Sequence, residues 1–380
     1  MVIDLKNNSK NKIAPLALIA TPGARELAKL IDGWLKQWLK KDLDDRDTFI
    51  LDSDCPRFTN GEAKGIVFDT VRGKDLYVIC DPYNHGITYN MYGKEIPMTP
   101  DEHYADLKRL LATTTGKPNR VTVIMPMLYG GRQHRRSARE SLDCAVMLHE
   151  LQAMGVKDVI TFDAHDDRVQ NAVPLMGFDN YYPHYQILKK LSKHFPDVQF
   201  NKDKMMIISP DEGAMNRNIA YATNLGLDLG MFYKRRDYTR IISGRNPIIS
   251  HEYIGSSVMG MDVFVADDII ATGDSILKLS YEIKEKGAKR VFLSSTFALF
   301  TEGLAKFDKA YEEKAFDGLF STNLTYRIPE LSKAKWFYET DMSKYLSYII
   351  AASNYQISAT KLLSPIEKIK KLMEKINNKN

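Results

Sequence analysis

The run MDVFVADDIIATGDSILKL, Met261–Leu279, places two adjacent acids at the end of an apolar stretch. The apolar residues are typical of a buried strand, and Asp267 and Asp268 follow them directly. In open α/β sheets, ligands bind at the carboxyl ends of strands. Two carboxylates there suit the vicinal hydroxyls of a sugar, or a metal ion that bridges them. An ordinary strand end in solvent is the alternative.

The next residues, Ala271–Ser275, turn the chain into a predicted helix. The backbone N–H groups at a helix start, with the hydroxyls of Thr272 and Ser275 beside them, suit a phosphate monoester. Gly273 lets the backbone approach such a ligand closely. Asp274 adds a carboxylate to this loop, and its like charge would weaken phosphate binding unless the side chain points outward.

Two clusters of basic residues follow other apolar runs. The segment MPMLYGGRQHRRSARE carries Arg132, Gln133 and His134 after a glycine pair. Because arginine is planar, always charged and bidentate, this loop suits a polyphosphate, with a nucleic-acid patch or a solvated loop as the alternative. The segment MFYKRRDYTR carries Lys234 and Arg236, for which a solvated charge run is the alternative.

Acids follow two further strand patterns. ITFDAHDDRVQ places His165 among Asp163, Asp166 and Asp167. A lone histidine is usually structural, but one among carboxylates at a strand end is a candidate metal ligand. MMIISPDEGAMNR places Asp211 ahead of a predicted helix, where an acidic residue would also be favourable without any ligand.

The segment CPRFTNGEAKGIVFDTVRGKD contains Asn-Gly turn chemistry, which by itself predicts only a β-hairpin. The sequence contains neither GxxxxGK[ST] nor GxGxxG. Nucleotide binding would therefore require a different constellation of residues.

The elements that must position these residues alternate between short apolar runs and amphipathic stretches, the βα rhythm of a parallel sheet. Predicted strands are Leu16–Ala20, Asp75–Cys80, Arg120–Met125, Asp158–Phe162, Met205–Ile208, Val263–Ala266 and Arg290–Ser294. Predicted helices are Ala24–Lys36, Asp101–Thr113, Ala138–Met154, Tyr185–Lys193, Ala214–Thr223 and Ser275–Lys286. Two halves divide around Met176–His184, and Arg240–Met259 resembles a β-excursion or a flexible loop. The basic tail Ser364–Asn380 predicts an amphipathic surface helix or an oligomer contact.

Length and composition bound the class of protein. A chain of 380 residues, 44% of them hydrophobic, is large enough for two compact domains. A net charge of +5 with few aromatics between the basic residues predicts no nucleic-acid partner. The three cysteines Cys55, Cys80 and Cys144 form no CxxC pair, which favours a reducing cytoplasm. The polar N-terminus precedes an apolar run too short to span a bilayer, so we expect a soluble, cytoplasmic protein without membrane contact.

The acidic pair and its loop resemble the phosphoribosyl-pyrophosphate-binding motif that phosphoribosyltransferases and ribose-phosphate pyrophosphokinases share. The other segments are similar to pyrophosphokinase elements and occur in family order: Arg-Phe-x-x-Gly-Glu, Val-Arg-Gly, Arg-Gln, Asp-x-His, Ser-Pro-Asp, Lys-Arg-Arg and the ribose-phosphate loop. The sequence is therefore identified as a divergent member of the ribose-phosphate pyrophosphokinase family.

The resemblance implies an α/β fold with two phosphoribosyltransferase-like domains, each a mainly parallel sheet flanked by helices. The expected domains are 1–178, with ATP and oligomer contacts, and 179–345, with the ribose 5-phosphate loop. A helical extension, 346–380, follows them. The resemblance also implies a homo-oligomer built from dimers, of which a hexamer is one form, with ATP sites shared between subunits.

The implied activity is the synthesis of 5-phospho-α-D-ribose 1-diphosphate. A Mg²⁺-dependent transfer moves the pyrophosphoryl group of ATP to the C1 hydroxyl of ribose 5-phosphate and releases AMP. The implied ATP-binding residues are Phe58, Asn60, Glu62, Arg132, Gln133 and His134. The implied ribose 5-phosphate site consists of Asp267, Asp268, Thr272, Gly273, Asp274 and Ser275. Lys234, Arg236 and Arg132 would stabilise the charge that develops during transfer. His165 and Asp211 would be the Mg²⁺ ligands.

The sequence departs from the family pattern at several positions. Ala271 stands where the family usually has an acid, and His134 where aspartate is common. Two alternatives therefore stay open. A phosphoribosyltransferase shares the ribose-phosphate loop but would not need both basic clusters. A non-catalytic regulatory homologue would explain the departures, but retention of Lys234, Arg236 and His165 argues against it.

Overall fold

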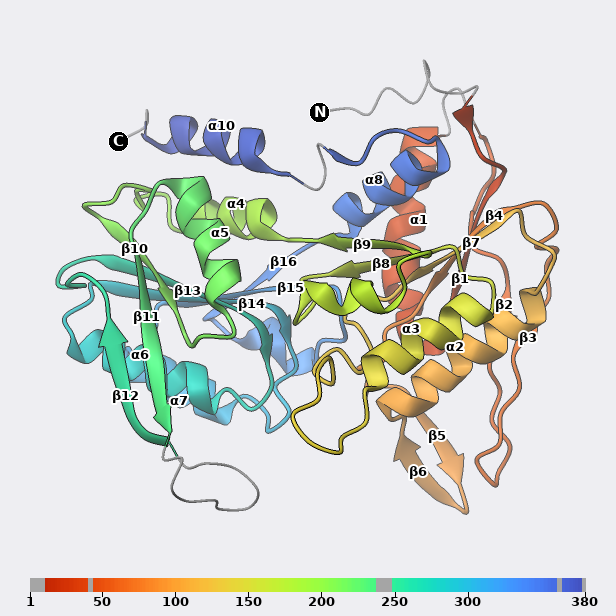
Figure 1. The fold of residues 1–380 in the computed structure, drawn as a ribbon, viewed down its shortest axis with the longest axis horizontal. Helices are drawn as coiled ribbons and strands as arrows, with labels where there is room; N and C mark the ends of the chain where they lie inside the picture. The colour runs from red at the N-terminus through yellow and green to blue at the C-terminus, as the bar shows by residue number, and fades with distance from the viewer. Residues whose placement is uncertain (1–10, 40–43, 237–247, 361–363, 378–380) are drawn as a thin grey trace. The chain divides into compact units, whose positions relative to one another are not determined.

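The computed structural model describes residues 11–39, 44–236, 248–360 and 364–377 (Figure 1). The chain forms two compact units. Unit 1 consists of Met1–Pro183, Asn323–Ile328 and Asp341–Ser364, and unit 2 consists of His184–Thr322, Pro329–Thr340 and Pro365–Asn380. Among the described residues, no helix is both long and apolar enough to cross a membrane.

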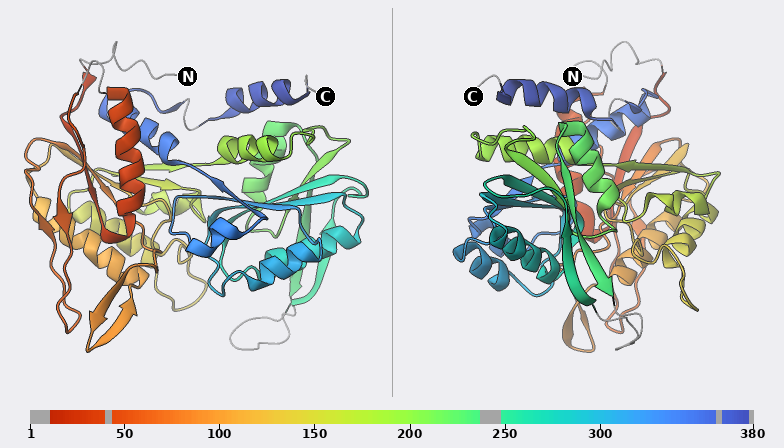
Figure 2. Two further views of the ribbon diagram at one scale, coloured as in Figure 1. Left: turned by 180° about the vertical axis from the view of Figure 1, so that it is seen from behind. Right: turned by 60° about the vertical axis from the view of Figure 1, so that its left-hand side comes forward.

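Unit 1 is a parallel sheet covered by helices on both faces (Figures 1 and 2). The strand order is β1-β4-β7-β8-β9, with β1 (Leu16–Ala20), β4 (Asp75–Ile79), β7 (Arg120–Ile124), β8 (Asp158–Phe162) and β9 (Gly177–Tyr181). Helices α2 (Pro100–Thr114) and α3 (Asp143–Ala153) pack on one face, and α1 (Arg25–Leu39) and α8 (Ser343–Asn354) lie together on the other. All pairs in this sheet are parallel, so every strand presents its carboxyl end at the same edge.

Unit 2 is a larger sheet of the same kind, with one antiparallel edge. Its order is β12-β11-β10-β13-β14-β15-β16, with β10 (Met205–Ser209), β11 (Leu229–Arg236), β12 (Ile248–Ile254), β13 (Asp262–Ile270), β14 (Arg290–Ala298), β15 (Gly318–Thr322) and β16 (Phe337–Thr340). Only the β11–β12 pair in this sheet is antiparallel. Helices α4 (His184–His194), α5 (Met215–Leu225) and α10 (Ile366–Asn377) cover one face, and α6 (Asp274–Glu285) and α7 (Ala305–Glu312) cover the other (Figure 2).

Smaller elements complete the described chain. Two short hairpins, β2–β3 (Ser53–Asp54 with Ile66–Val67) and β5–β6 (Thr88–Met91 with Lys94–Pro97), belong to unit 1. The 3₁₀ turns are η2 (Pro22–Ala24), η3 (Asp167–Ala172) and η4 (Pro329–Lys333).

A buried ion pair explains why α8 belongs to unit 1 although it follows unit 2 strands in the sequence. Arg120 of β7 donates to both carboxylate oxygens of the fully buried Asp75, at 2.8 and 2.9 Å. Asn354 also donates to Asp75 at 2.8 Å, and Arg120 donates to Ser353 at 2.9 Å. A buried charge must be paired and hydrogen-bonded, so this network fixes the end of α8 to the sheet.

All of the predicted strands and helices are present, with differences at their ends. Helix α3 begins at Asp143 rather than Ala138, because Glu140 accepts bonds from the backbone N–H and hydroxyl of Ser137 in a local turn. Strands β13 and β14 are longer than predicted, reaching Ile270 and Ala298. The elements that had not been predicted include strands β5, β6, β9, β11, β15 and β16 and helices α7 and α8.

For Arg240–Met259 the sequence left a β-excursion or a flexible loop open, and the described part of this segment contains strand β12. Residues 240–247 lie outside the described residues. The C-terminal extension does not form a unit of its own: residues up to Ser364 group with unit 1, and those from Pro365 group with unit 2.

Helix α10 is an integral part of the unit 2 core. Ile369 is fully buried against α4 and α5, whereas its neighbour Lys370 is exposed. We expect Ile369→Ala to destabilise unit 2 by about 2–5 kcal/mol, because it removes buried methyl groups and leaves a cavity. Thermal unfolding followed by circular dichroism measures this, with Lys370→Ala as the matched control. Equal stability of both variants would contradict a structural role for α10.

Candidate active site

The predicted phosphate loop connects β13 to α6 in unit 2. Gly273 adopts a left-handed conformation with φ of 89°. A Cβ atom at this position would lie 2.2 Å from Cζ of Phe307, so only glycine fits the turn. Helix α6 begins at Asp274, so the N–H groups of its first turn lack intrahelical partners and point out of the loop. The tight turn and the helix start therefore provide the donors that a phosphate needs.

Asp267 and Asp268 lie within the last part of β13, which continues to Ile270, rather than after the end of the strand as the sequence predicted. The Asp267 side chain is 29% exposed and the Asp268 side chain 6%. Arg217 of α5 approaches both, with its Nη1 at 3.8 Å from Asp267 and its Nη2 at 4.0 Å from Asp268. Burial, followed by the charge of Asp268, raises the pKa of Asp267 well above its ordinary value, and Arg217 opposes this shift.

Two residues of α5 position this acidic pair, and the sequence analysis missed both. Asn218 is fully buried, donates to the Ala266 carbonyl at 2.8 Å and accepts from the Ala266 N–H at 3.2 Å. Arg217 precedes it and brings a positive charge to within 3.8 Å of Asp267 and 4.0 Å of Asp268. The sequence could have indicated these two residues, because they lie in the helix that follows the Ser-Pro-Asp segment at the end of β10.

Asp211 lies at the carboxyl-terminal edge of the unit 2 sheet, in the turn that follows β10. Its Oδ1 accepts from the Ala214 N–H at 3.1 Å, and Ser209 donates to its carbonyl at 2.8 Å. The charge of Asp211 also contributes to the raised pKa of Asp267. The charge of Asp211 is therefore felt at the acidic pair.

Two predicted site segments of unit 1 lie close together: the loop after β7 that was predicted to bind nucleotide, and the segment after β8 that was predicted to hold a metal. They do so because β7 and β8 are adjacent parallel strands. The His134 and His165 rings have centroids 5.3 Å apart, and His134 Nε2 lies 3.5 Å from Asp166. Burial lowers the pKa of His134, so the ring tends to stay neutral. The Arg168 guanidinium, 2.5 Å from Asp166, lowers the pKa of that carboxyl to about 2. Arg132 and Gln133 are exposed in the same loop.

The predicted adenine hairpin is present and exposed. Phe58 donates its N–H to the Glu62 carbonyl at 2.7 Å, and the residue is 52% exposed to solvent. Asn60 donates to the Glu62 carboxylate at 2.8 Å, so these two predicted base-reading side chains lie together. Arg57, which donates to both oxygens of the buried Asp106 at 2.8 Å, anchors the hairpin to α2. The predicted Asn-Gly turn is confirmed, with Gly61 at φ of 93°.

The predicted catalytic cations lie on β11. The backbone of Lys234 pairs with His251 and that of Arg236 with Ile248, with a register shift between Arg235 and Arg236. Their side chains lie outside the described residues. Strand β11 pairs with β10 up to Ser209, opposite Met231, so Lys234 lies beyond the carboxyl end of β10. Its backbone thus stands at the edge of the sheet where Asp211 follows β10.

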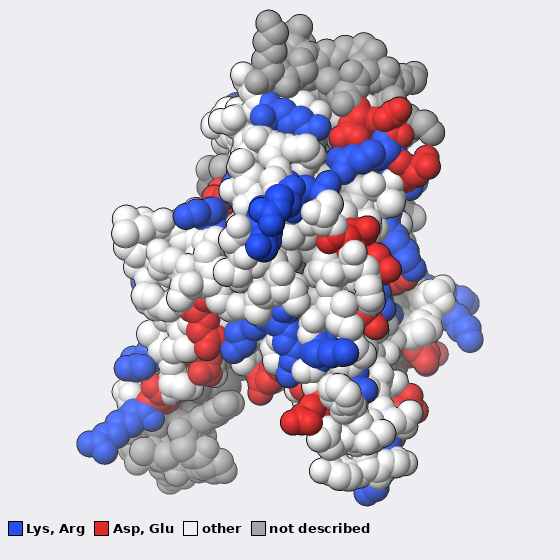
Figure 3. Space-filling view, turned by 90° about the vertical axis from the view of Figure 1, so that its right-hand side faces the viewer, with Lys and Arg blue, Asp and Glu red and all other residues white. Residues whose placement is uncertain are grey.

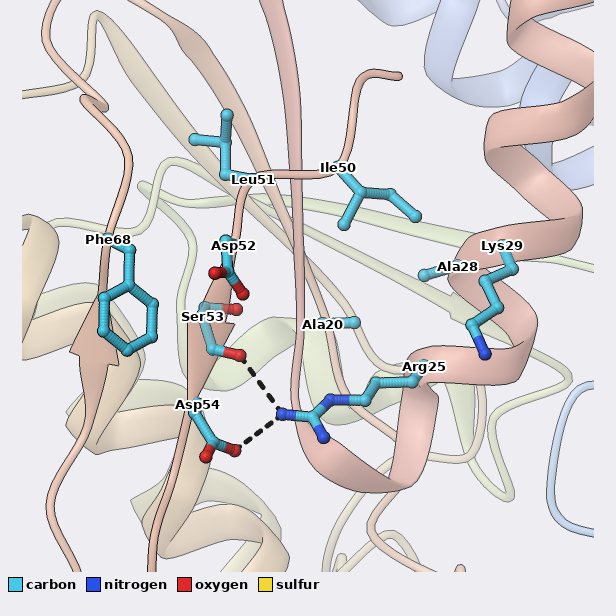
Figure 4. A pocket seen from close by; sticks show the side chains of 10 residues that line it. All are labelled: Ala20, Arg25, Ala28, Lys29, Ile50, Leu51, Asp52, Ser53, Asp54 and Phe68. Atoms are coloured by element: carbon cyan, nitrogen blue, oxygen red, sulfur yellow. Dashed lines mark hydrogen bonds and ion pairs between the residues drawn. The ribbon is translucent and has the colours of Figure 1, made fainter. Parts of the chain in front are cut away.

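A pocket of about 390 Å³ opens at the side of unit 1, beside α1, β2 and β3. Figure 4 shows Arg25 reaching from the start of α1 to the Ser53 carbonyl and the Asp54 carboxylate, at 3.1 and 2.6 Å. None of the predicted site residues lines this pocket. Since it lies apart from those residues, we assign it no part in the chemistry.

The surface charge is mixed on the face shown in Figure 3. Lys and Arg alternate there with Asp and Glu among uncharged residues, and the described residues of that face form no broad area of one sign.

The acids of unit 2 fit a magnesium ion that arrives with its substrate. Mg²⁺ prefers oxygen ligands and commonly takes one or two protein carboxylates together with waters and phosphate oxygens. Asp211, Asp267 and Asp268 offer such oxygens. Within the described part of the chain, no group of three or more His, Cys, Asp or Glu side chains is arranged as a complete metal site.

The fold and the acidic loop define a protein of the phosphoribosyltransferase-like class, and the comparisons specify it further. A family model described as the N-terminal domain of ribose phosphate pyrophosphokinase matches residues 16–155, and a phosphoribosyl transferase domain matches residues 178–310. A ribose-phosphate pyrophosphokinase of Ralstonia nicotianae is 31% identical over 254 residues, 66% of this chain and 71% of the relative. That of Burkholderia pseudomallei is 31% identical over 255 residues, 66% of this chain and 70% of the relative.

A solved structure shares the fold. The phosphoribosylpyrophosphate synthetase of Mycobacterium smegmatis aligns with 89% of this chain and 98% of its own, at a TM-score of 0.72 and 21% identity. The chain belongs to the ribose-phosphate pyrophosphokinase family and is an enzyme of that class. The family and the α/β fold predicted from the sequence are confirmed.

Proposed function

We propose that this enzyme transfers the pyrophosphoryl group of ATP to the C1 hydroxyl of ribose 5-phosphate, with Mg²⁺, and releases AMP. The observation that carries the proposal is the position of Asp267 and Asp268 beside a tight phosphate loop, in a member of this family. The loop fits a sugar phosphate, and the carboxylates fit the ribose hydroxyls.

Ribose 5-phosphate binds to unit 2. Its phosphate accepts from the hydroxyls of Thr272 and Ser275 and from the N–H groups at the start of α6. Asp267 and Asp268 accept from the ribose hydroxyls, and Arg217 offsets part of their repulsion. This arrangement fixes the sugar and orients C1, so positioning supplies much of the rate enhancement.

ATP binds through unit 1 residues. Phe58 stacks on the adenine, Asn60 and Glu62 contact its edge, and Arg132, Gln133 and His134 contact the phosphates. The enzyme is a homo-oligomer built from dimers in this proposal, and the exposed Phe58 hairpin contacts a neighbouring subunit's nucleotide. We place the enzyme in the cytoplasm, consistent with three free, buried cysteines among the described residues.

In the transfer itself, the C1 oxygen forms a bond to the β-phosphorus, and the bond from that phosphorus to the α,β-bridging oxygen breaks. AMP leaves with the bonding electrons, and the C1 hydroxyl proton passes to solvent. Lys234, Arg236 and Arg132 stabilise the charge on the transferring and leaving oxygens. Bound Mg²⁺ would neutralise phosphate oxygens, with His165 and Asp211 among the groups that hold it.

Phosphorus NMR of the purified protein with ribose 5-phosphate, ATP and Mg²⁺ tests the proposal. We expect AMP to appear together with a diphosphate ester on ribose C1. Product formation from 5-phosphoribosyl diphosphate and a free base, without consumption of ATP, would instead indicate a phosphoribosyltransferase. Binding of both substrates without turnover would indicate a regulatory homologue.

Phe58→Ala should raise the KM for ATP while leaving the KM for ribose 5-phosphate unchanged. Stacking of a base on an aromatic ring contributes about 1–3 kcal/mol, which corresponds to about 5- to 150-fold in affinity. Phe68→Ala is the matched control, because Phe68 is an exposed phenylalanine of the same unit, at 64% exposure against 52% for Phe58. If both variants have the same KM for ATP, the assignment of Phe58 is wrong.

A further inference from the structure

The phosphate loop contains an anion of its own. Asp274 accepts from the Thr272 hydroxyl at 2.9 Å through Oδ2, and from Lys306 Nζ at 2.6 Å through Oδ1. The Asp274 side chain is 65% exposed, so its carboxylate lies on the open side of the loop. The carboxylate therefore engages a hydroxyl that a substrate phosphate would use, and it draws a lysine to the same place.

Lys306 is held beside the loop by the packing of α7. The neighbouring Phe307 is fully buried against Gly273, where a Cβ atom would be 2.2 Å away. The segment that leads to α7 is bonded to the loop as well, through the Thr301 N–H and the Ala271 carbonyl at 3.0 Å. Core packing thus fixes the backbone of Lys306 beside the loop, whereas its side chain can move between hydrogen-bond partners.

The charges of Asp274, Lys306 and an incoming phosphate decide how Lys306 acts at this loop. A phosphate dianion that enters the loop meets the Asp274 carboxylate, and like charges repel. Lys306 also pairs with Glu302, and an ammonium group has three donors. It can therefore keep Glu302 and exchange the Asp274 carboxylate for a phosphate oxygen. Lysine suits this exchange because it is a compact charge on a flexible stem.

We propose that Lys306 is the side-chain cation of the ribose 5-phosphate site, and that Asp274 holds it and Thr272 in place until the sugar phosphate displaces the carboxylate. The inference rests on the proposed function, because it assigns a further binding residue to the same site. It also explains how a loop with an acidic residue at its helix start can accept a dianion.

Binding of ribose 5-phosphate, measured by calorimetry without ATP, tests the proposal on four proteins. Lys306→Ala should weaken binding about tenfold or more, as expected for loss of a hydrogen bond to a charged group. Asp274→Asn should tighten binding several-fold, because it removes the repulsion and releases Thr272 and Lys306. In the Asp274→Asn background, Lys306→Ala should still weaken binding. Inorganic phosphate should compete with the sugar phosphate in each case.

Lys309→Ala is the matched control. It removes an exposed lysine from the same helix, which pairs with Glu313 at 3.9 Å. Equal affinities of Lys306→Ala and Lys309→Ala would overturn the proposal. Loss of the Lys306→Ala effect in the Asp274→Asn background would also overturn it, because Lys306 would then only neutralise Asp274. If the wild-type protein binds no ribose 5-phosphate and forms no product, the proposed function itself fails. Equal thermal unfolding of all variants confirms that folding is intact.

Discussion

Asp267→Asn should abolish most of the turnover of ribose 5-phosphate while making the protein more stable. A hydrogen bond to a charged group contributes about 1.5–3 kcal/mol, so kcat/KM for ribose 5-phosphate should fall by about 10- to 150-fold. Stability should rise because Asp267 and Asp268 repel each other, and Arg217, at 3.8 and 4.0 Å, offsets this only in part. An active site that stores such repulsion gains stability when the functional group is removed.

The pH dependence of stability provides an independent check. The folded state raises the pKa of Asp267 above that of the unfolded chain. Ionisation of this carboxyl therefore costs stability, and the cost develops as pH rises above about 4 and is complete above the folded pKa. The stability advantage of Asp267→Asn over the wild type should be small at low pH and grow through this range.

Steady-state kinetics and thermal unfolding between pH 4 and pH 8 measure both effects. Asp203→Asn removes an exposed carboxylate from the same unit and serves as the control. An Asp267→Asn variant that keeps wild-type kcat/KM, or that is less stable than the wild type at neutral pH, would contradict the role assigned to the acidic pair.

Lys234→Ala should lower kcat by about 10²–10³-fold or more, as expected for loss of one group that stabilises developing charge in a phosphoryl-transfer reaction. The KM for ribose 5-phosphate should change little, because the loop and acids to which we assign sugar binding belong to β13 and α6. Lys234→Arg should recover only part of the rate, since a guanidinium differs from an ammonium in size and hydrogen-bond geometry.

Single-turnover measurements with saturating ATP distinguish a slower transfer step from weaker binding. Lys278→Ala, at an exposed position of α6 where the lysine pairs with Glu282, is the control. A Lys234→Ala enzyme that transfers at the wild-type rate would exclude Lys234 from the catalytic step and would favour other cations, such as Arg132.

The sequence by itself determined the family, the α/β fold and the order of the elements. Strands such as β1 and β8 have the bounds that their apolar runs predict, because strands buried on both faces read as continuous hydrophobic segments. The acidic pair, the phosphate loop and the basic clusters were also visible, because each lies within a few residues of a strand end. The order of neighbouring residues in the sequence is enough to detect such motifs.

Only the tertiary structure decided what surrounds these motifs. Lys306 pairs with Asp274 across 32 residues, and Asn218 joins Ala266 across 48. Asn354 of α8 bonds to Asp75 across 279 residues, and α10 packs against α4 and α5 in unit 2. Neither periodicity nor spacing reports such contacts, because they depend on which strands become neighbours in the sheet. The sequence could therefore show a carboxylate in the phosphate loop, but its compensation by Lys306 arises from the packing of α7 beneath Gly273.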